Sequence, residues 1–220
     1  MQIDLAYNDL ECLYEFQYWT QKFSYLVDRL GLRIKCDPES IRPYFRAAPI
    51  SERKKFIAKI RFYSQLIASA EAENIDIMKD KAFLWKSFSQ IGLLPNSDLF
   101  SQIHPGDYIE VYDSEGVQLF ANFEFLSLIS YSFEEILWWS WDQLFARDPR
   151  HTETMMVNFT HCFTQALGPF VPSVEDHICW ETRSETPKKA LVTLKMFAPL
   201  FARNKKPMAM LATSKIQLLI

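Results

Sequence analysis

The stretch from Phe120 to Asp148, FANFEFLSLISYSFEEILWWSWDQLFARD, decides how the second half of this 220-residue chain folds. Ser132 is a good N-cap residue, and Glu135 stands three positions later, which completes the sequence pattern of a capping box. The stretch therefore predicts a short helix that begins just after Ser132. Its neighbours predict a strand pair before it and a long helix after it.

The residues directly upstream have the pattern of a β-hairpin. Tyr108 to Tyr112 alternates in polarity, Asp113-Ser114-Glu115-Gly116 supplies turn residues, and Val117 to Ala121 resumes as a strand. Asn122 then precedes a short helical run through Leu128. Two antiparallel strands followed by short helices are therefore expected.

Downstream, Thr152 to Ala166 has the period of an amphipathic helix, and three strand-like runs follow it: Val174 to Thr182, Ala190 to Ala198 and Pro207 to Ile216. Strict alternation in the second run places Val192, Leu194 and Met196 on one face and Phe197 on the other. Because both faces are apolar, we expect the second face to be covered by first-half helices or by another subunit.

The motif and this order of elements together resemble the PAS sensor family. Its members commonly carry a hairpin ending in Asn, a helix, and then the pattern G-Y-S-x-E-E-L-x-G-x-x-W-x-x-L-F before an acidic residue. Ser130 and Trp138 stand where the family often has glycine. The matching residues are Tyr131, Ser132, Glu134, Glu135, Leu137, Trp141, Leu144, Phe145 and Asp148. The resemblance implies an α+β fold in which residues 101–220 form a PAS-like domain, a five-stranded antiparallel sheet with helices on one face.

The resemblance also implies a ligand cavity between the sheet and the helices. The side chains predicted to line it are Phe125, Leu137, Trp141, Phe145, Phe159 and Phe163. A dry, fully packed core is the alternative, and the aromatic content of 15% favours it. His161 lies where haem-binding members carry an axial ligand, but a lone helical His is more often exposed or hydrogen-bonded. Neither Cys162 nor Cys179 stands in a flavin-reactive Asn-Cys-Arg signature, so no cofactor is assigned.

The first half predicts a helical module over residues 1–95. A long helix from Asp9 to Leu30 ends at Gly31, a short helix capped by Asp37 is interrupted at Pro43, and Asp76 to Gln90 forms a further helix before a linker at Leu94 to Ser97. Between them, Ser51 can cap a helix over residues 51–68. The first turns of that helix carry the basic residues Arg53, Lys54, Lys55, Lys59 and Arg61.

Composition excludes several functional classes. The formal charge of −3 has both signs interspersed, which disfavours nucleic acid as a partner. Four cysteines without a CxxC pair and an N-terminus without a basic, apolar leader predict a reducing, cytoplasmic location, and no apolar run is long enough for a membrane. The histidines show no metal-ligand spacing. No nucleophile motif or phosphate loop is present either, so we expect neither a metal site nor an enzyme.

We therefore expect a cytosolic regulatory or sensory protein. Its PAS-like domain would bind a small ligand or a protein partner and relay the signal through helix packing or dimerisation, as a homodimer or with another protein. The first alternative is an interaction or dimerisation module that binds no ligand. The second is a transcriptional regulator that uses the basic helix 51–68 on DNA.

Overall fold

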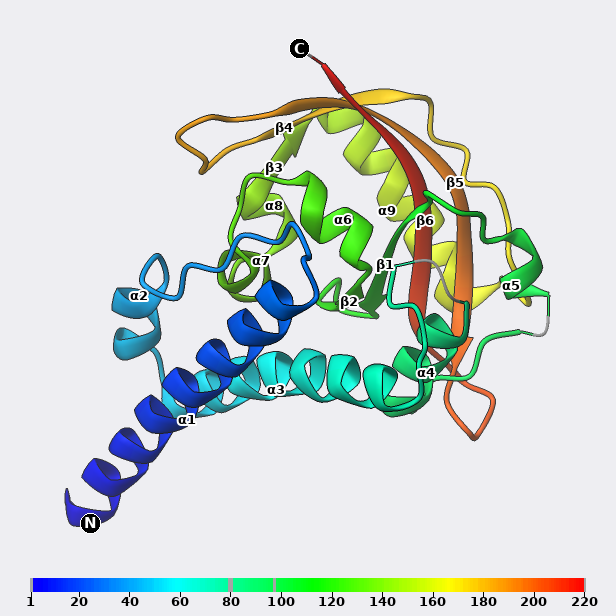
Figure 1. Ribbon diagram of the computed structural model, residues 1–220. Coiled ribbons are helices and arrows are strands. Elements are labelled where there is room, and N and C mark those ends of the chain that lie inside the picture. Colours follow the sequence, from blue (N-terminus) through cyan, green and yellow to red (C-terminus); the bar gives the residue numbers. More distant parts are fainter. Residues whose placement is uncertain (1, 79–80, 97, 220) are drawn as a thin grey trace. The chain divides into compact units, whose positions relative to one another are not determined.

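The computed structural model describes residues 2–78, 81–96 and 98–219 (Figure 1). Its contacts divide the chain into two compact units. Unit 1 comprises Met1–Asn74 and Tyr131–Trp139, and unit 2 comprises Ile75–Ser130 and Ser140–Ile220. Within the described ranges, every helix is too short or too polar to span a bilayer.

Unit 1 is helical and contains α1 (Gln2–Arg29), α2 (Arg42–Ala47), α3 (Ile50–Ala72) and α7 (Phe133–Trp138). Figure 1 shows α1 and α3 packed against each other at an oblique angle. Phe133 of α7 stacks on Phe23 of α1 with ring centroids 3.7 Å apart, and it meets Tyr63 of α3 edge-on at 5.1 Å. A segment from the second half of the sequence, Tyr131–Trp139, thus completes the core of the helical unit.

The helix ends in unit 1 partly follow the sequence signals. Gly31 adopts a φ of 64° just past α1, which confirms the predicted stop. The helix predicted from Asp37 is wrong, because α2 begins at Arg42 and carries Pro43 in its first turn, where a missing N–H costs nothing. The predicted cap at Ser51 is also wrong, since Pro49 holds that position and α3 begins at Ile50.

The basic residues of α3 are largely engaged within unit 1. Arg53 is buried and donates to the Ala48 carbonyl oxygen at 2.8 Å and to Asp9. Arg61 pairs with Glu15 at 2.7 Å. These contacts give Arg53 and Arg61 a structural explanation, because acids on α1 and a carbonyl oxygen of the α2–α3 turn receive their guanidinium groups.

Unit 2 contains an antiparallel sheet in the order β2-β1-β6-β5-β4-β3. The strands are β1 (Tyr108–Asp113), β2 (Gln118–Ala121), β3 (Phe145–Arg147), β4 (His177–Glu181), β5 (Lys189–Phe201) and β6 (Pro207–Leu219). The helices are α4 (Lys81–Gln90), α5 (Leu99–Gln102), α6 (Phe123–Leu128), α8 (Trp141–Leu144) and α9 (Pro149–Thr164). The single antiparallel sheet confirms the PAS-like fold class.

The described sheet has six strands where five were predicted. The additional strand, β3, is three residues long and pairs with Cys179 to Glu181 of β4. Three residues directly after a helical turn carry no alternation that a sequence pattern could detect. Pairing with a strand more than thirty residues away creates this element.

A β-bulge in β5 also changes which side chains share a face. The register with β6 shifts between Leu194 and Met196, so that Leu194 pairs with Ser214 and Phe197 with Ala212. The prediction that Phe197 opposes Leu194 is therefore wrong, because the extra residue at Lys195 breaks the period of two. Lys195 instead reaches Asp107 at 2.6 Å.

The two faces of the sheet are covered differently. On one face, α9 packs along β5 and β6 (Figure 1). The core cluster on this side contains Tyr112, Cys162, Phe197, Met210 and Ala212. On the other face, the rings of Phe88 in α4 and Phe120 have their centroids 6.3 Å apart. Phe120 pairs with Val111, whose side chain points to the opposite face from that of its neighbour Tyr112.

The segment predicted as a linker is bound to this sheet. Leu94 exchanges two backbone hydrogen bonds with Phe201, at 2.7 and 2.9 Å. The helix predicted over residues 76–90 is described from Lys81 onward, and Lys79, Asp80 and Ser97 lie outside the described residues. Residues 94–96 are therefore attached to the end of β5.

Candidate functional site

A group of polar side chains lies on the α9 side of the sheet in unit 2, beside the apolar core cluster. We call it the Arg147 cluster. It consists of Glu110, Tyr112, Gln118, Arg147, His151 and His177, which come from β1, β2, β3, α9 and β4. Polar groups inside a core need hydrogen-bond partners, so the way in which each of them is satisfied bears directly on function.

Arg147 is the central charge of this cluster. Its position on β3, opposite Cys179, directs the half-buried side chain to the inner face of the sheet. The guanidinium lies 3.7 Å from the centroid of the Trp141 ring. Its Nη1 donates to the Met155 sulfur at 3.0 Å and lies 3.4 Å from His177 Nε2.

These partners of Arg147 are all neutral. The Nε atom is buried without a partner, and among the described residues no carboxylate forms an ion pair with this guanidinium. Burial lowers the pKa of Arg147 from its usual value, yet an arginine stays charged in proteins. The cluster therefore holds a positive charge whose counter-ion is not supplied within hydrogen-bond reach.

His177 is held as a neutral ring. Its Nδ1 lies 3.0 Å from the Glu175 carbonyl oxygen, which can only accept, so Nδ1 carries the proton. Burial, with further contributions from Arg147 and His151, lowers the pKa of His177. Its Nε2 is then an acceptor that faces Arg147. The His151 ring stacks on it with ring centroids 5.0 Å apart, and Nδ1 of His151 is buried without a hydrogen-bond partner among the residues that the structure describes.

Glu110 is the acid of the cluster. Tyr112 donates its hydroxyl to Oε1 of Glu110, and Gln118 Nε2 donates to the same oxygen at 2.9 Å. Burial raises the pKa of Glu110 to about 7, although these two donors and the charge of Arg147 act in the opposite direction. Near neutral pH the carboxyl therefore exchanges between a neutral and an ionised form.

The structure separates the residues predicted to line a cavity. Trp141, Phe159 and Phe163 pack against the core cluster. Phe145 lies 4.9 Å from Trp141 and 6.4 Å from Phe125, measured between ring centroids. Leu137 belongs to α7 in unit 1 and is buried there. Five of the six thus lie in unit 2, and their role as a cavity lining stays a prediction.

No motif in the sequence groups Glu110, Arg147, His151 and His177. The alternation of β1 and β4 could have placed Glu110 and His177 on inward positions, as polar residues between apolar ones. Arg147 gave no such signal, because its strand was not predicted. Only the pairing of β3 with β4 brings it beside the other members.

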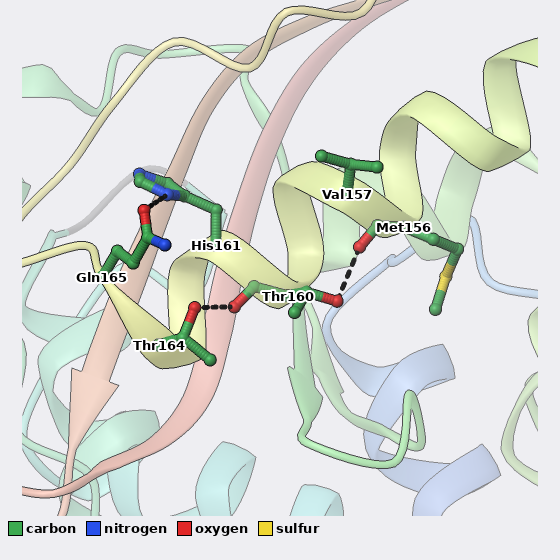
Figure 2. A pocket seen from close by; sticks show the side chains of 6 residues that line it. All are labelled: Met156, Val157, Thr160, His161, Thr164 and Gln165. Atoms are coloured by element: carbon green, nitrogen blue, oxygen red, sulfur yellow. Dashed lines mark hydrogen bonds between the residues drawn. The ribbon is translucent and has the colours of Figure 1, made fainter.

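A shallow pocket of about 460 Å³ lies on the outward face of α9 (Figure 2). Thr160 and Thr164 donate to carbonyl oxygens of their own helix at 2.9 Å, and His161 Nδ1 lies 3.1 Å from Gln165 Oε1. Figure 2 shows these bonds running along the helix. The pocket therefore offers polar groups that are already satisfied. Among the residues described, no three or more His, Cys, Asp or Glu side chains could hold a metal ion.

Comparison with known proteins identifies PAS domains as structural neighbours. One is the PAS-B domain of Drosophila melanogaster Cycle, a tryptophan-to-alanine variant with bound glycerol, at 13% identity and a TM-score of 0.39, covering 50% of this chain and 99% of that one. Another is the PAS domain of an HTR-like protein from Haloarcula marismortui, at 18% identity and a TM-score of 0.35, covering 61% and 94%. A third is a sensory box sensor histidine kinase from Vibrio cholerae, at 10% identity and 0.33, covering 62% and 96%.

No protein-family model matches the sequence, and no curated protein matches it either.

Proposed function

We propose that this chain is a sensory or regulatory protein whose PAS-like unit binds a small molecule at the Arg147 cluster. One observation carries the proposal: a half-buried guanidinium that contacts an aromatic face, a thioether and a neutral imidazole. Burying a charge without a charged or strongly polar partner costs free energy, which a ligand can recover. A guanidinium without a charged partner would not stabilise a core that binds no ligand.

Ligand binding in unit 2 would affect unit 1 through the residues of the chain that join the two units. Trp141 of unit 2 covers Arg147, and Trp139 of unit 1 contacts Tyr44 edge-on at 4.8 Å. Ser140 alone separates the two tryptophans, and it caps α8 through Gln143. A ligand that shifts Trp141 would therefore act on a segment whose other end, Trp139, is half-buried and packs on the exposed ring of Tyr44 in unit 1. Such a ligand changes the equilibrium only if it binds the two arrangements unequally.

A thermal-shift screen with a chemically diverse library of acids, amines and neutral compounds tests this proposal. A ligand at one hundred times its Kd stabilises a protein by about 2.7 kcal/mol, which for a chain of this size raises Tm by roughly 5 to 10 °C. Hits are then followed in backbone amide NMR spectra. We expect shifts at β3, β4 and the start of α9, and at Trp139. The absence of any stabilising compound, or hits that leave these signals unchanged, would refute the proposal.

The exposed side of β4 favours a second candidate, an interaction module. Ile178 is 47% exposed, Trp180 is 39% exposed, and both point away from the inner face that His177 and Cys179 occupy. Leu219, which shares a row with Trp180 across Lys189, is 40% exposed. Native mass spectrometry of wild type and Trp180→Glu tests this candidate. A dimer that the substitution abolishes would support it, and a monomeric wild type across micromolar concentrations would exclude self-association.

A further inference from the structure

Building on the proposed function, we propose that the ligand is a monocarboxylate with an apolar body, and that Arg147 binds its carboxylate. Three features of the Arg147 cluster lead to this class of ligand: the charge that has to be balanced, the surface beside it, and the weakness of the contact that the ligand would replace.

The charge balance favours a single negative charge. Arg147 is the permanent cation of the cluster, while burial lowers the pKa of His177 and so favours its neutral ring, with the proton on Nδ1. One carboxylate neutralises one guanidinium and matches the geometry of its N–H groups. A phosphate dianion would leave an excess negative charge beside Glu110, and a cationic ligand would repel Arg147.

The surroundings of Arg147 favour an apolar body behind the carboxylate. Trp141 covers one face of the guanidinium, and Met155 contacts its Nη1. Both side chains pack against the core cluster, as do Phe159 and Phe163. A ligand whose acidic end reaches Arg147 therefore places the rest of its atoms among rings and a thioether, where alkyl or aryl groups are stabilised by burial.

The contact that the ligand would replace is weak. A thioether sulfur is a poor acceptor for a charged donor, and Nε of Arg147 has no acceptor among the described residues. Methionine is also unbranched and flexible, so Met155 can withdraw at small cost. Displacing Met155 would free Nη1 of Arg147 and open space for the ligand at the same time. His151 Nδ1, buried without a partner, is a further group that could bond the second carboxylate oxygen.

Glu110 would compete with the ligand for this positive charge. The groups around the cluster are Tyr112 and Gln118 on β1 and β2, Arg147 on β3, His177 and Cys179 on β4, and His151 on α9. Burial places the pKa of Glu110 at about 7, so the carboxyl is neutral at pH 6 and largely ionised at pH 8. Ligand carboxylates are ionised throughout this range. Binding should therefore weaken severalfold as the pH rises from 6 to 8.

The test uses isothermal titration of the full chain with hexanoate, benzoate and 3-phenylpropionate, each beside its neutral amide, and with inorganic phosphate. We expect saturable binding of at least one carboxylate and an affinity at least about tenfold lower for its amide, because hydrogen bonds to a charged group are lost. Arg147→Met should lower the carboxylate affinity by a similar factor. Arg150→Met is the matched control: Arg150 lies three residues away and its side chain is 85% exposed, so binding should persist.

The outcomes separate this inference from the function on which it rests. Equal binding of acid and amide, tighter binding of phosphate, or unchanged binding in Arg147→Met would overturn the monocarboxylate assignment. Library hits that include no monocarboxylate would also overturn this assignment. They would leave the proposal that the protein binds a small molecule intact. A library without any hit overturns both. The acid and amide comparison is made on the wild type, so it holds even if Arg147→Met fails to fold. In Glu110→Gln the affinity should no longer depend on pH between 6 and 8, and persistent pH dependence would remove Glu110 from the mechanism.

Discussion

Replacing Glu134 by Gln should change how the stability of unit 1 depends on pH. Glu134 lies in the first turn of α7, and its side chain is fully buried. Oε2 accepts the backbone N–H of Asp37 at 2.9 Å, whereas Oε1 is buried and has no hydrogen-bond partner in the described part of the chain. Burial raises the pKa of Glu134 to about 7, and the nearby charges of Asp37 and Glu135 add to that effect. Gln keeps the acceptor for Asp37 and removes the ionisation.

The direction and size of the effect follow from proton linkage. Between its ordinary pKa of 4.5 and the raised value of about 7, the folded protein binds more protons at Glu134 than the unfolded chain does. The stabilisation is therefore complete below pH 4.5 and is lost as the pH rises through 7. At 1.36 kcal/mol per pKa unit, the wild type should lose about 3 kcal/mol across this window through Glu134, and Glu134→Gln should lose none of it.

Urea denaturation followed by circular dichroism, at several pH values from 4.5 to 8.5, measures this effect. The free energy of unfolding of the variant minus that of the wild type should rise by about 3 kcal/mol from the lowest to the highest pH. Glu52→Gln is the control, because Glu52 is exposed on α3 of the same unit, and its difference from wild type should stay nearly constant. A difference for Glu134→Gln that does not change with pH would refute the reasoning.

Two further predictions concern the side chains that fix the fold. Asn122→Ala should lower the free energy of unfolding, measured by urea denaturation, by about 2 to 4 kcal/mol. The buried amide of Asn122 accepts from the N–H groups of Ile109 and Phe125 and donates to the Asp107 carbonyl oxygen. A loss below about 1 kcal/mol would contradict this prediction. Phe133→Ala should cost about 3 to 5 kcal/mol by the same assay, since the ring is fully buried against unit 1, and a near-neutral result would mean that α7 does not complete that core.

Local chemistry explains what the sequence could predict. Ser132 and Glu135 form the capping box in the structure, with the Glu135 N–H donating to the serine hydroxyl at 3.2 Å and the Ser132 N–H to the glutamate at 2.8 Å. Asn122 caps α6 where the hairpin ends. These interactions join residues three positions apart, so short patterns are sufficient to specify them. The fold class follows from such signals taken in order.

The candidate site depends instead on contacts between residues far apart in the chain. Arg147 meets His177 across thirty positions because β3 pairs with β4, and Glu110 shares their face because β1 pairs with β6. The bulge near Lys195 turns Phe197 into the core cluster, against the simple alternation. The sequence by itself determined the order of the helices, turns and longer strands, since caps, turns and periodicity depend on residues a few positions apart. Only the tertiary structure decided the register of the strands, and with it which cation, Arg147, has no carboxylate within hydrogen-bond reach among the described residues.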